Sequence, residues 1–455
     1  MRHLSLVPRP TSAATHPEIL LHVMSSVSTL SSLTFFILMR FIFLQFQLTL
    51  PRILLLSSLL ILALSALLPS TFPSLRMRLL LLTQHLFPST RNMASSSSAN
   101  VYAKELQTAL LAVQRAALLT RAVFNTTAKR TLSKSDHSPV TIGDFGAQAL
   151  IIAALQHVFP ADAIVAEEES SALRENIDLR DAVWSYVHET RLADARAEDA
   201  IGGPLKDTQA MIEAIDKGDS VGGASGRIWA IDPIDGTKGF LRGGQYAVCL
   251  ALMVDGDVKV GVLGCPNLPV DDAARVDAAT GRDQRDEEGK GVLISAVVGH
   301  GATSRPLERG ALQDGHAIAM KPVEDITKAT FCESVEAAHS NQGEQAEIAR
   351  RLGVVKEPVR MDSQAKYASI ARGAGDIYLR LPVRKDYQEK IWDHAAGDLI
   401  VREAGGSVTD SDGKRLDFSK GRTLVENKGV VAAPKAIHPK VLQVVQEVLQ
   451  ETSRR

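Results

Sequence analysis

Cysteines, long hydrophobic runs and excess basic charge are all scarce in this chain of 455 residues. The three cysteines form no Cys-x-x-Cys pair and have no histidines at zinc-binding spacing. Their pattern excludes a disulfide framework and indicates a reducing compartment, with the thiols buried and free. The longest apolar run, residues 53–68, is interrupted by three serines and is shorter than the roughly 20 residues that cross a bilayer comfortably.

Acidic residues are almost absent from the first 92 positions, which contain seven arginines, no lysine and one acid, Glu18. Removing them from the totals of 51 basic and 52 acidic side chains leaves 44 and 51, a net charge of −7, in residues 93–455. An acidic body argues against a nucleic-acid-binding surface, which requires clustered Lys and Arg. A composition of 45% hydrophobic and 23% charged residues also excludes wholesale disorder and collagen.

The Arg-, Leu- and Ser-rich segment 1–99 is predicted to lie outside the fold. Three interpretations of it stay open: an organellar presequence, a signal anchor that inserts residues 35–68, or untranslated sequence upstream of a true start at Met93. We therefore expect a cytoplasmic protein, or a mitochondrial or membrane-tethered one if residues 1–92 are translated.

Helix and strand patterns alternate from residue 100 onward, without an internal repeat, which indicates a mixed α/β fold. Helices are predicted over 100–124, 145–158, 344–352, 365–372, 392–404 and 439–451. Strands are predicted over 164–166, 227–231, 246–254, 258–263, 292–298, 329–333 and 377–381. Asp255-Gly256 predicts a hairpin turn. Residues 174–224, which are charged and weakly periodic, are predicted to be an insertion or lid outside the core, and residues 270–290 a loop.

Two carboxylates three residues apart follow an apolar strand in the motif DPIDGT (232–237). Asp232 and Asp235 can converge on one point, and carboxylates with backbone carbonyls suit Mg²⁺ rather than zinc. The Gly-Thr turn into a helix offers backbone N–H groups to an anion. An Asx turn before a helix is the alternative, but it explains one aspartate and not two.

Three further acidic motifs are weak when each is taken alone. Glu167 begins a run of three acids after another short strand, which by itself is typical of a solvated charge run. Asp393, at the start of an apolar helix, is typical of an N-cap. Asp136 begins a polar turn that continues to Asp144 before a helix.

Together, and in this order, the four motifs resemble the inositol monophosphatase superfamily of Mg²⁺-dependent, lithium-sensitive phosphatases. Longer stretches resemble its 3′(2′),5′-bisphosphate nucleotidase branch, of the fungal and plant sulfur-assimilation type. These stretches are SDHSPVTIGDFGAQ (135–148), EEESSALR (167–174), DPIDGTKGFLRGGQYAVCLALM (232–253), ESVEAAHS (333–340), MDSQAKYASIARGAGDIYLRLP (361–382) and YQEKIWDHAAGDLIVREAGG (387–406). The resemblance covers residues 100–455 and none of 1–92.

The resemblance implies a role for each matching residue. The metal ligands for two or three Mg²⁺ ions would be Glu167, Asp232, Asp235, Asp393 and the carbonyl of Ile234. Asp136 and Thr237 would activate the attacking water. The substrate-binding residues would be Gly236, Thr237, His339, Ser363, Lys366, Arg380 and Asp393.

The resemblance also implies a layered α-β-α-β-α sandwich with two subdomains and the metal site between them. The N-terminal α+β subdomain (100–300) would contain the metal motifs, and the C-terminal α/β subdomain (301–455) the nucleotide-binding residues and Asp393. The implied activity is hydrolysis of 3′-phosphoadenosine 5′-phosphate, and of 3′-phosphoadenylyl sulfate, by a monomer without nucleic-acid or membrane partners. An inositol phosphate phosphatase and a non-catalytic nucleotide-binding protein remain as alternatives; loss of a metal carboxylate would favour the latter, and none is missing.

Overall fold

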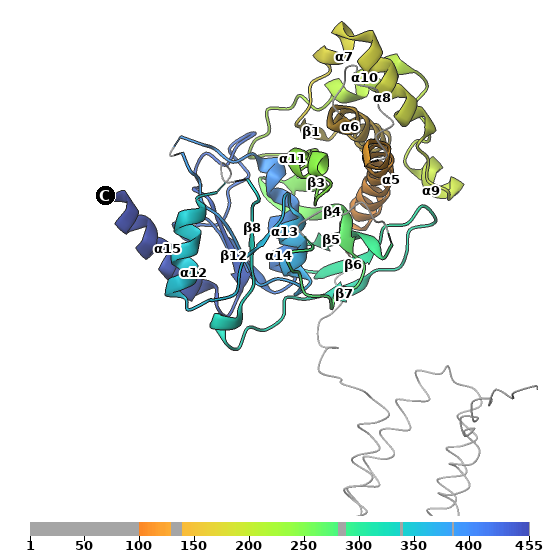
Figure 1. Ribbon diagram of the computed structural model, residues 1–455. Coiled ribbons are helices and arrows are strands. Elements are labelled where there is room, and N and C mark those ends of the chain that lie inside the picture. The colour runs from red at the N-terminus through yellow and green to blue at the C-terminus, as the bar shows by residue number, and fades with distance from the viewer. Residues whose placement is uncertain (1–99, 129–138, 281–287, 337–339, 385, 455) are drawn as a thin grey trace, which may run out of the picture. The chain divides into compact units, whose positions relative to one another are not determined.

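The computed structural model describes residues 100–128, 139–280, 288–336, 340–384 and 386–454. The N-terminal segment 1–99 and two of the expected site residues, Asp136 and His339, lie outside the described residues. Residues 99–455 form one unit, and Figure 1 labels most of its helices and strands.

The larger sheet has seven strands that follow one another in chain order. They are β1 (Ala163–Ala166), β2 (Arg227–Asp235), β3 (Ala247–Val254), β4 (Asp257–Pro269), β5 (Lys290–Val297), β6 (Ala302–Pro306) and β7 (His316–Ile318). β1 is parallel to β2, and all later neighbours are antiparallel. The hairpin predicted at Asp255-Gly256 is confirmed, because both residues have positive φ angles between β3 and β4.

The smaller sheet has five strands in the order β11-β12-β10-β8-β9. They are β8 (Phe331–Glu333), β9 (Val359–Arg360), β10 (Ile377–Arg380), β11 (Gly406–Thr409) and β12 (Val430–Pro434). The boundary between the sheets differs from the position expected at residue 300, because β6 and β7 extend the first sheet to Ile318.

Helices cover the faces of both sheets. α5 (Ala103–Ala128) and α6 (Pro139–Val158) pack on one face of the larger sheet. α13 (Ala365–Ala371) and α14 (Ala395–Glu403) lie between the two sheets, and α12 (Gln342–Arg351) and α15 (His438–Ser453) pack on the outer face of the smaller sheet. The layers therefore alternate as α-β-α-β-α, which is the arrangement that the resemblance implied.

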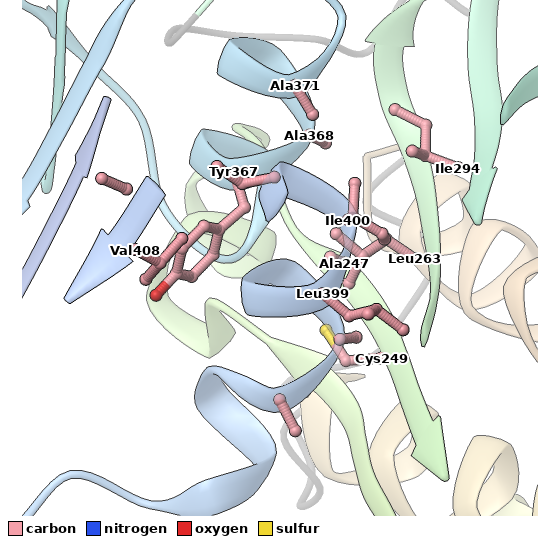
Figure 2. Packing of buried hydrophobic residues seen from close by; sticks show 14 of the residues in the cluster. Ala247, Cys249, Leu263, Ile294, Tyr367, Ala368, Ala371, Leu399, Ile400 and Val408 are labelled. Atoms are coloured by element: carbon pink, nitrogen blue, oxygen red, sulfur yellow. The ribbon is translucent and has the colours of Figure 1, made fainter. Parts of the chain in front are cut away.

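The middle helical layer joins the two sheets through small and aliphatic side chains (Figure 2). Leu399 and Ile400 of α14 pack toward Leu263 of the larger sheet, while Tyr367 of α13 faces Val408 of the smaller one. Each fully buried side chain of this size stabilises the fold by about 1.5–3 kcal/mol.

The three cysteines are buried and free, as predicted.

Residues 174–224 differ from their prediction, because they add helices to the core. The helices of this region are α7 (Ser171–Glu175), α8 (Ile177–Glu189), α9 (Ala195–Ala200) and α10 (Thr208–Asp216). Val183 and Val187 of α8 and Met211 of α10 are buried in the same cluster as Phe145 and Leu150 of α6. Each helix is short and buries only one side, so the segment as a whole reads as polar.

Helix α6 begins at Pro139, six residues before its predicted start at Phe145. Asp144 is therefore a helical residue and not part of a turn. Among the described residues, α6 is the one helix long and apolar enough to cross a membrane, but 78% of its apolar window is buried in the protein. Such burial is typical of a core helix.

Candidate active site

A cavity of about 220 Å³ opens where β2 ends. Its lining consists of Glu167, Asp232, Ile234, Asp235, Gly236, Thr237, Lys238, Ser334, Asp362, Ser363, Gln364, Lys366, Tyr378, Arg380, Tyr387 and Asp393. Every expected site residue that the structure describes is in this lining. Asp136 and His339 lie outside the described residues, and their assigned roles stay predictions.

Strand register brings Glu167 and Asp232 together. β1 and β2 are parallel, and Ala166 pairs with Ile231. The residues that follow this pair, Glu167 just after the end of β1 and Asp232 within β2, therefore lie side by side. Gln148 of α6 fixes this segment, because its side-chain amide donates to the Glu168 carbonyl at 2.7 Å and accepts from the Glu168 N–H at 2.9 Å.

A β-bulge turns Asp232 and Asp235 toward the same cavity. Residues three apart on a regular strand point to opposite faces of the sheet. Here Asp232 pairs with Cys249 and Asp235 with Ala247, so one extra residue is inserted in β2. A bulge of this kind re-aims side chains, and Pro233 fits at this position because it has no N–H for the sheet.

Gly236 reverses the chain between Asp235 and helix α11 (Thr237–Arg242). Its φ of 89° is in the left-handed region, and a Cβ atom there would lie 2.9 Å from the Cβ of Ser363. Only glycine meets both requirements without strain. The turn leaves Thr237 exposed in the cavity lining, where its hydroxyl donates to the Ile234 carbonyl at 3.5 Å.

Gln364, which the sequence did not single out, connects three parts of the site. Its backbone N–H donates to Asp235 at 2.5 Å, and its side-chain amide donates to the Trp392 carbonyl at 2.8 Å. The side-chain oxygen accepts from the Gly397 N–H at 2.9 Å. Gln364 therefore fixes the backbone on both sides of Asp393 relative to Asp235.

Burial raises the pKa of all four carboxylates, and repulsion within the group adds to this effect for Glu167, Asp232 and Asp235. Burial and the neighbouring Glu167 and Asp235 raise the pKa of Asp232 well above its usual range. Burial, followed by Asp393, raises the pKa of Asp235 to about 6. Glu167 is exposed over its side chain as a whole, but desolvation of its carboxylate and the nearby Asp393 raise its pKa to about 8. We call these four carboxylates the acidic wall of the cavity. Their negative charges destabilise one another in the folded protein.

This donor set fits a hard divalent cation. One oxygen of the buried Asp232 carboxylate has no hydrogen-bond partner, and a buried carboxylate oxygen normally has one. All ligand atoms offered by Glu167, Asp235 and Asp393 are also oxygens, which Mg²⁺ prefers. A cation would satisfy the unpaired oxygen and offset the repulsion between the acids.

Asp144 is a candidate functional residue to which the sequence assigned no role. It is 7% exposed on α6, and burial together with Glu168 and Glu167 raises its pKa well above the usual range. It in turn raises the pKa of Asp232. An acid within an apolar helix is the signal that could have identified it.

The cavity lining also contains two buried cations, Arg380 and Lys366, which we call its basic wall. Arg380 binds both oxygens of the buried Glu389 at 2.7 Å and lies 3.9 Å from Asp393. Burial alone would raise the pKa of Glu389, but Arg380 and His394 lower it to about 2. Lys366 is 3% exposed, and burial lowers its pKa to about 8.

Glu389, Asp393 and His394 also lie close enough together to bind a metal, with ligand atoms within 4.8 Å of one another. Both ring nitrogens of His394 are already engaged, one with the Tyr367 hydroxyl at 2.9 Å and one with Glu389 at 3.2 Å. Glu389 and His394 therefore form a hydrogen-bond network next to the cavity-lining Asp393, and we do not assign a second metal centre to this group.

Comparisons with known proteins agree with this arrangement. The family model described as the inositol monophosphatase family matches residues 102–450. A 3′(2′),5′-bisphosphate nucleotidase from Emericella nidulans is 63% identical over 349 residues, 77% of this chain and 99% of the relative. The enzyme of the same name from Schizosaccharomyces pombe is 49% identical over 76% of this chain and 95% of its own length. The one from Oryza sativa is 43% identical over 79% of this chain and 98% of its own length. The chain therefore belongs to the inositol monophosphatase family and, within it, to the 3′(2′),5′-bisphosphate nucleotidases.

Proposed function

We propose that the cavity hydrolyses the 3′-phosphate of 3′-phosphoadenosine 5′-phosphate, which yields AMP and phosphate. The observation that carries this proposal is that a single cavity is lined by both the acidic wall and the basic wall. The first suits cations and a phosphate that is cleaved, and the second suits a phosphate that stays on the product. The names of the relatives support the same substrate class.

Glu167, Asp232, Asp235 and Asp393, with the Ile234 carbonyl, would hold two or three Mg²⁺ ions. When bound, these ions supply positive charge to the phosphoryl oxygens and acidify a water molecule. Gly236 and Thr237 would position the phosphate through their backbone N–H groups. In this mechanism the enzyme forms no covalent bond to the phosphate.

The Thr237 hydroxyl would orient the attacking water and transfer its proton to a neighbouring acid. The resemblance assigned this acid to Asp136. Asp144 is the better candidate within the described residues, because α6 places it beside Glu167 and Asp232.

Lys366 and Arg380 would bind the phosphate that remains on the product. Arg380 presents a planar guanidinium that Glu389 already orients, which suits bidentate phosphate recognition. The Ser363 hydroxyl, beside Gly236, would add a further contact. Asp393 and His339 would complete the substrate site.

Phosphate release from the purified protein tests this function. With Mg²⁺, 3′-phosphoadenosine 5′-phosphate should be hydrolysed with a higher kcat/KM than inositol 1,4-bisphosphate. A higher value for the inositol substrate would instead favour an inositol phosphatase, and binding of nucleotide without turnover would favour a non-catalytic protein. The same assay tests 3′-phosphoadenylyl sulfate as a second substrate and lithium as an inhibitor. We propose that lithium inhibits the enzyme and that the enzyme acts in sulfur assimilation and salt tolerance.

We also propose that residues 1–92 are not needed for catalysis and that the enzyme is cytoplasmic. A chain beginning at Met93 should match the full chain in kcat/KM. Mass spectrometry of the native N-terminus should find a peptide beginning at Ala94. Peptides from upstream of Met93 in mitochondrial or membrane fractions would show instead that the segment is a targeting or anchoring element.

A further inference from the structure

Tyr387 is an exposed aromatic residue in the wall of the active-site cavity. It is 45% exposed, and no other aromatic side chain appears among the large hydrophobic residues exposed in the described part of the chain. Leaving a tyrosine ring open to solvent inside a binding cavity forgoes the burial that such a ring normally gains. An aromatic ligand would supply that burial.

The position of Tyr387 is fixed from both sides. Its hydroxyl accepts a hydrogen bond from the Arg380 guanidinium at 3.4 Å. The residues that follow it are bound to a neighbouring segment, because the Leu424 N–H donates to the Glu389 carbonyl at 2.8 Å and the Ile391 N–H to the Arg422 carbonyl at 3.2 Å. Hydrogen bonds therefore hold the segment that carries the Tyr387 ring in place.

The other aromatic residue of the described lining, Tyr378, is unsuited to contact a ligand ring. It is 2% exposed, and the Lys366 ammonium lies over its ring at 5.4 Å from the centroid. Tyr387 is therefore the residue of the described lining with a free aromatic surface.

We infer that the ring of Tyr387 stacks on the nucleobase of the substrate and makes the enzyme selective for bisphosphate nucleotides over bisphosphates without a base. This inference rests on the proposed function. Arg380 suits the phosphate that is not cleaved, and in a mononucleotide that phosphate and the base are attached to the same ribose. A tyrosine hydrogen-bonded to this arginine lies where the base can reach it. Every nucleobase has a π face, so the contact favours nucleotides as a class.

The test uses two substrates that differ only in the base: adenosine 3′,5′-bisphosphate and 1,4-anhydroribitol 3,5-bisphosphate. Tyr387→Leu keeps an apolar side chain of moderate size and removes the ring, whereas Tyr387→Phe keeps the ring and removes the hydroxyl. From the energy of a base–aromatic stack, Tyr387→Leu should raise KM for the nucleotide about tenfold. Its kcat should stay within twofold, and the compound without a base should be unaffected. Tyr387→Phe should resemble the wild type on both substrates.

Binding without turnover gives a second measurement. In Tyr387→Trp, addition of AMP should quench fluorescence beyond the change seen in the wild type, while 1,4-anhydroribitol 5-phosphate should not. Equal losses on both substrates in Tyr387→Leu would show that the residue acts through Arg380, and would overturn the inference. So would an unchanged KM, or an absence of base-dependent quenching. If the wild type does not hydrolyse the nucleotide at all, the proposed function fails and not merely the role of Tyr387.

Discussion

The two walls of the cavity differ in how their charges are balanced. On the acidic wall, burial and mutual repulsion raise the pKa values of Glu167, Asp232 and Asp235. On the basic wall, Arg380 binds both oxygens of Glu389, whose pKa falls to about 2. The comparison teaches that the acidic wall would gain stability from a bound cation, whereas Arg380 and Glu389 balance each other's charges without any ligand.

The largest effect is expected from Asp232→Asn. Hydrolysis should fall by about a thousandfold or more, because the acidic wall would lose a proposed metal ligand that is buried. In the absence of metal, however, Tm should rise, because the substitution removes an unpaired buried charge. Phosphate release and thermal unfolding with a chelator measure the two effects.

Asp257→Asn is the matched control for this prediction. Asp257 is paired with Lys259 at 2.7 Å on the other side of β3 from the site motif, and its pKa is lowered. Activity should stay at the wild-type value and Tm should fall slightly. A lower metal-free Tm in Asp232→Asn would contradict the account of the acidic wall.

Replacing Asp144 and Asp136 in turn should show which of these two candidates accepts the proton. Asp144→Asn should lower kcat by about a hundredfold or more, the usual contribution of a general base, with KM within about threefold. Asp136→Asn should stay close to the wild type. Steady-state kinetics on both variants decide the question, and the reverse ranking would restore the assignment made from the sequence.

Glu389→Gln should disturb the basic wall. Arg380 would lose its charged partner in a buried position, so we expect a lower Tm and a KM raised about tenfold, with a smaller change in kcat. Glu347→Gln is the control: that carboxylate also has a pKa lowered to about 2 by arginines, but it lies on the surface, and its loss should hardly change Tm. Equal losses of Tm in the two variants would show that burial of the pair is unimportant.

The smallest effect is a pH dependence of the metal-free protein. Glu167 and Asp235 have ordinary pKa values of 4.5 and 3.8 and folded values of about 8 and about 6. The folded state binds these protons more tightly, so the contribution of these two groups to stability is greatest below pH 4 and is lost as the pH rises toward 8. Saturating Mg²⁺ should flatten this part of the Tm profile. A slope that is the same with and without Mg²⁺ would be incompatible with a cation site at these residues.

The sequence predicted the members of the cavity well, because the motifs that contain them are long and occur in a specific order. The sequence could not predict the directions in which these side chains point. Asp232 and Asp235 face the same cavity only because of a bulge, and no residue pattern specifies that bulge. Gln364 connects parts of the chain through hydrogen bonds that exist only in the folded protein. The helices of 174–224 were missed because each buries a narrow apolar side.

The spacing of the acidic residues along the chain has a consequence for how this enzyme is made. Glu167 and Asp393 belong to one cavity, yet more than two hundred residues separate them in the sequence. Contacts between such distant residues carry a high loop-closure entropy and form late during folding. A nascent or truncated chain that ends before Asp393 would contain most of the acids without the complete cation site. Tight Mg²⁺ binding would therefore mark chains whose synthesis and folding have been completed.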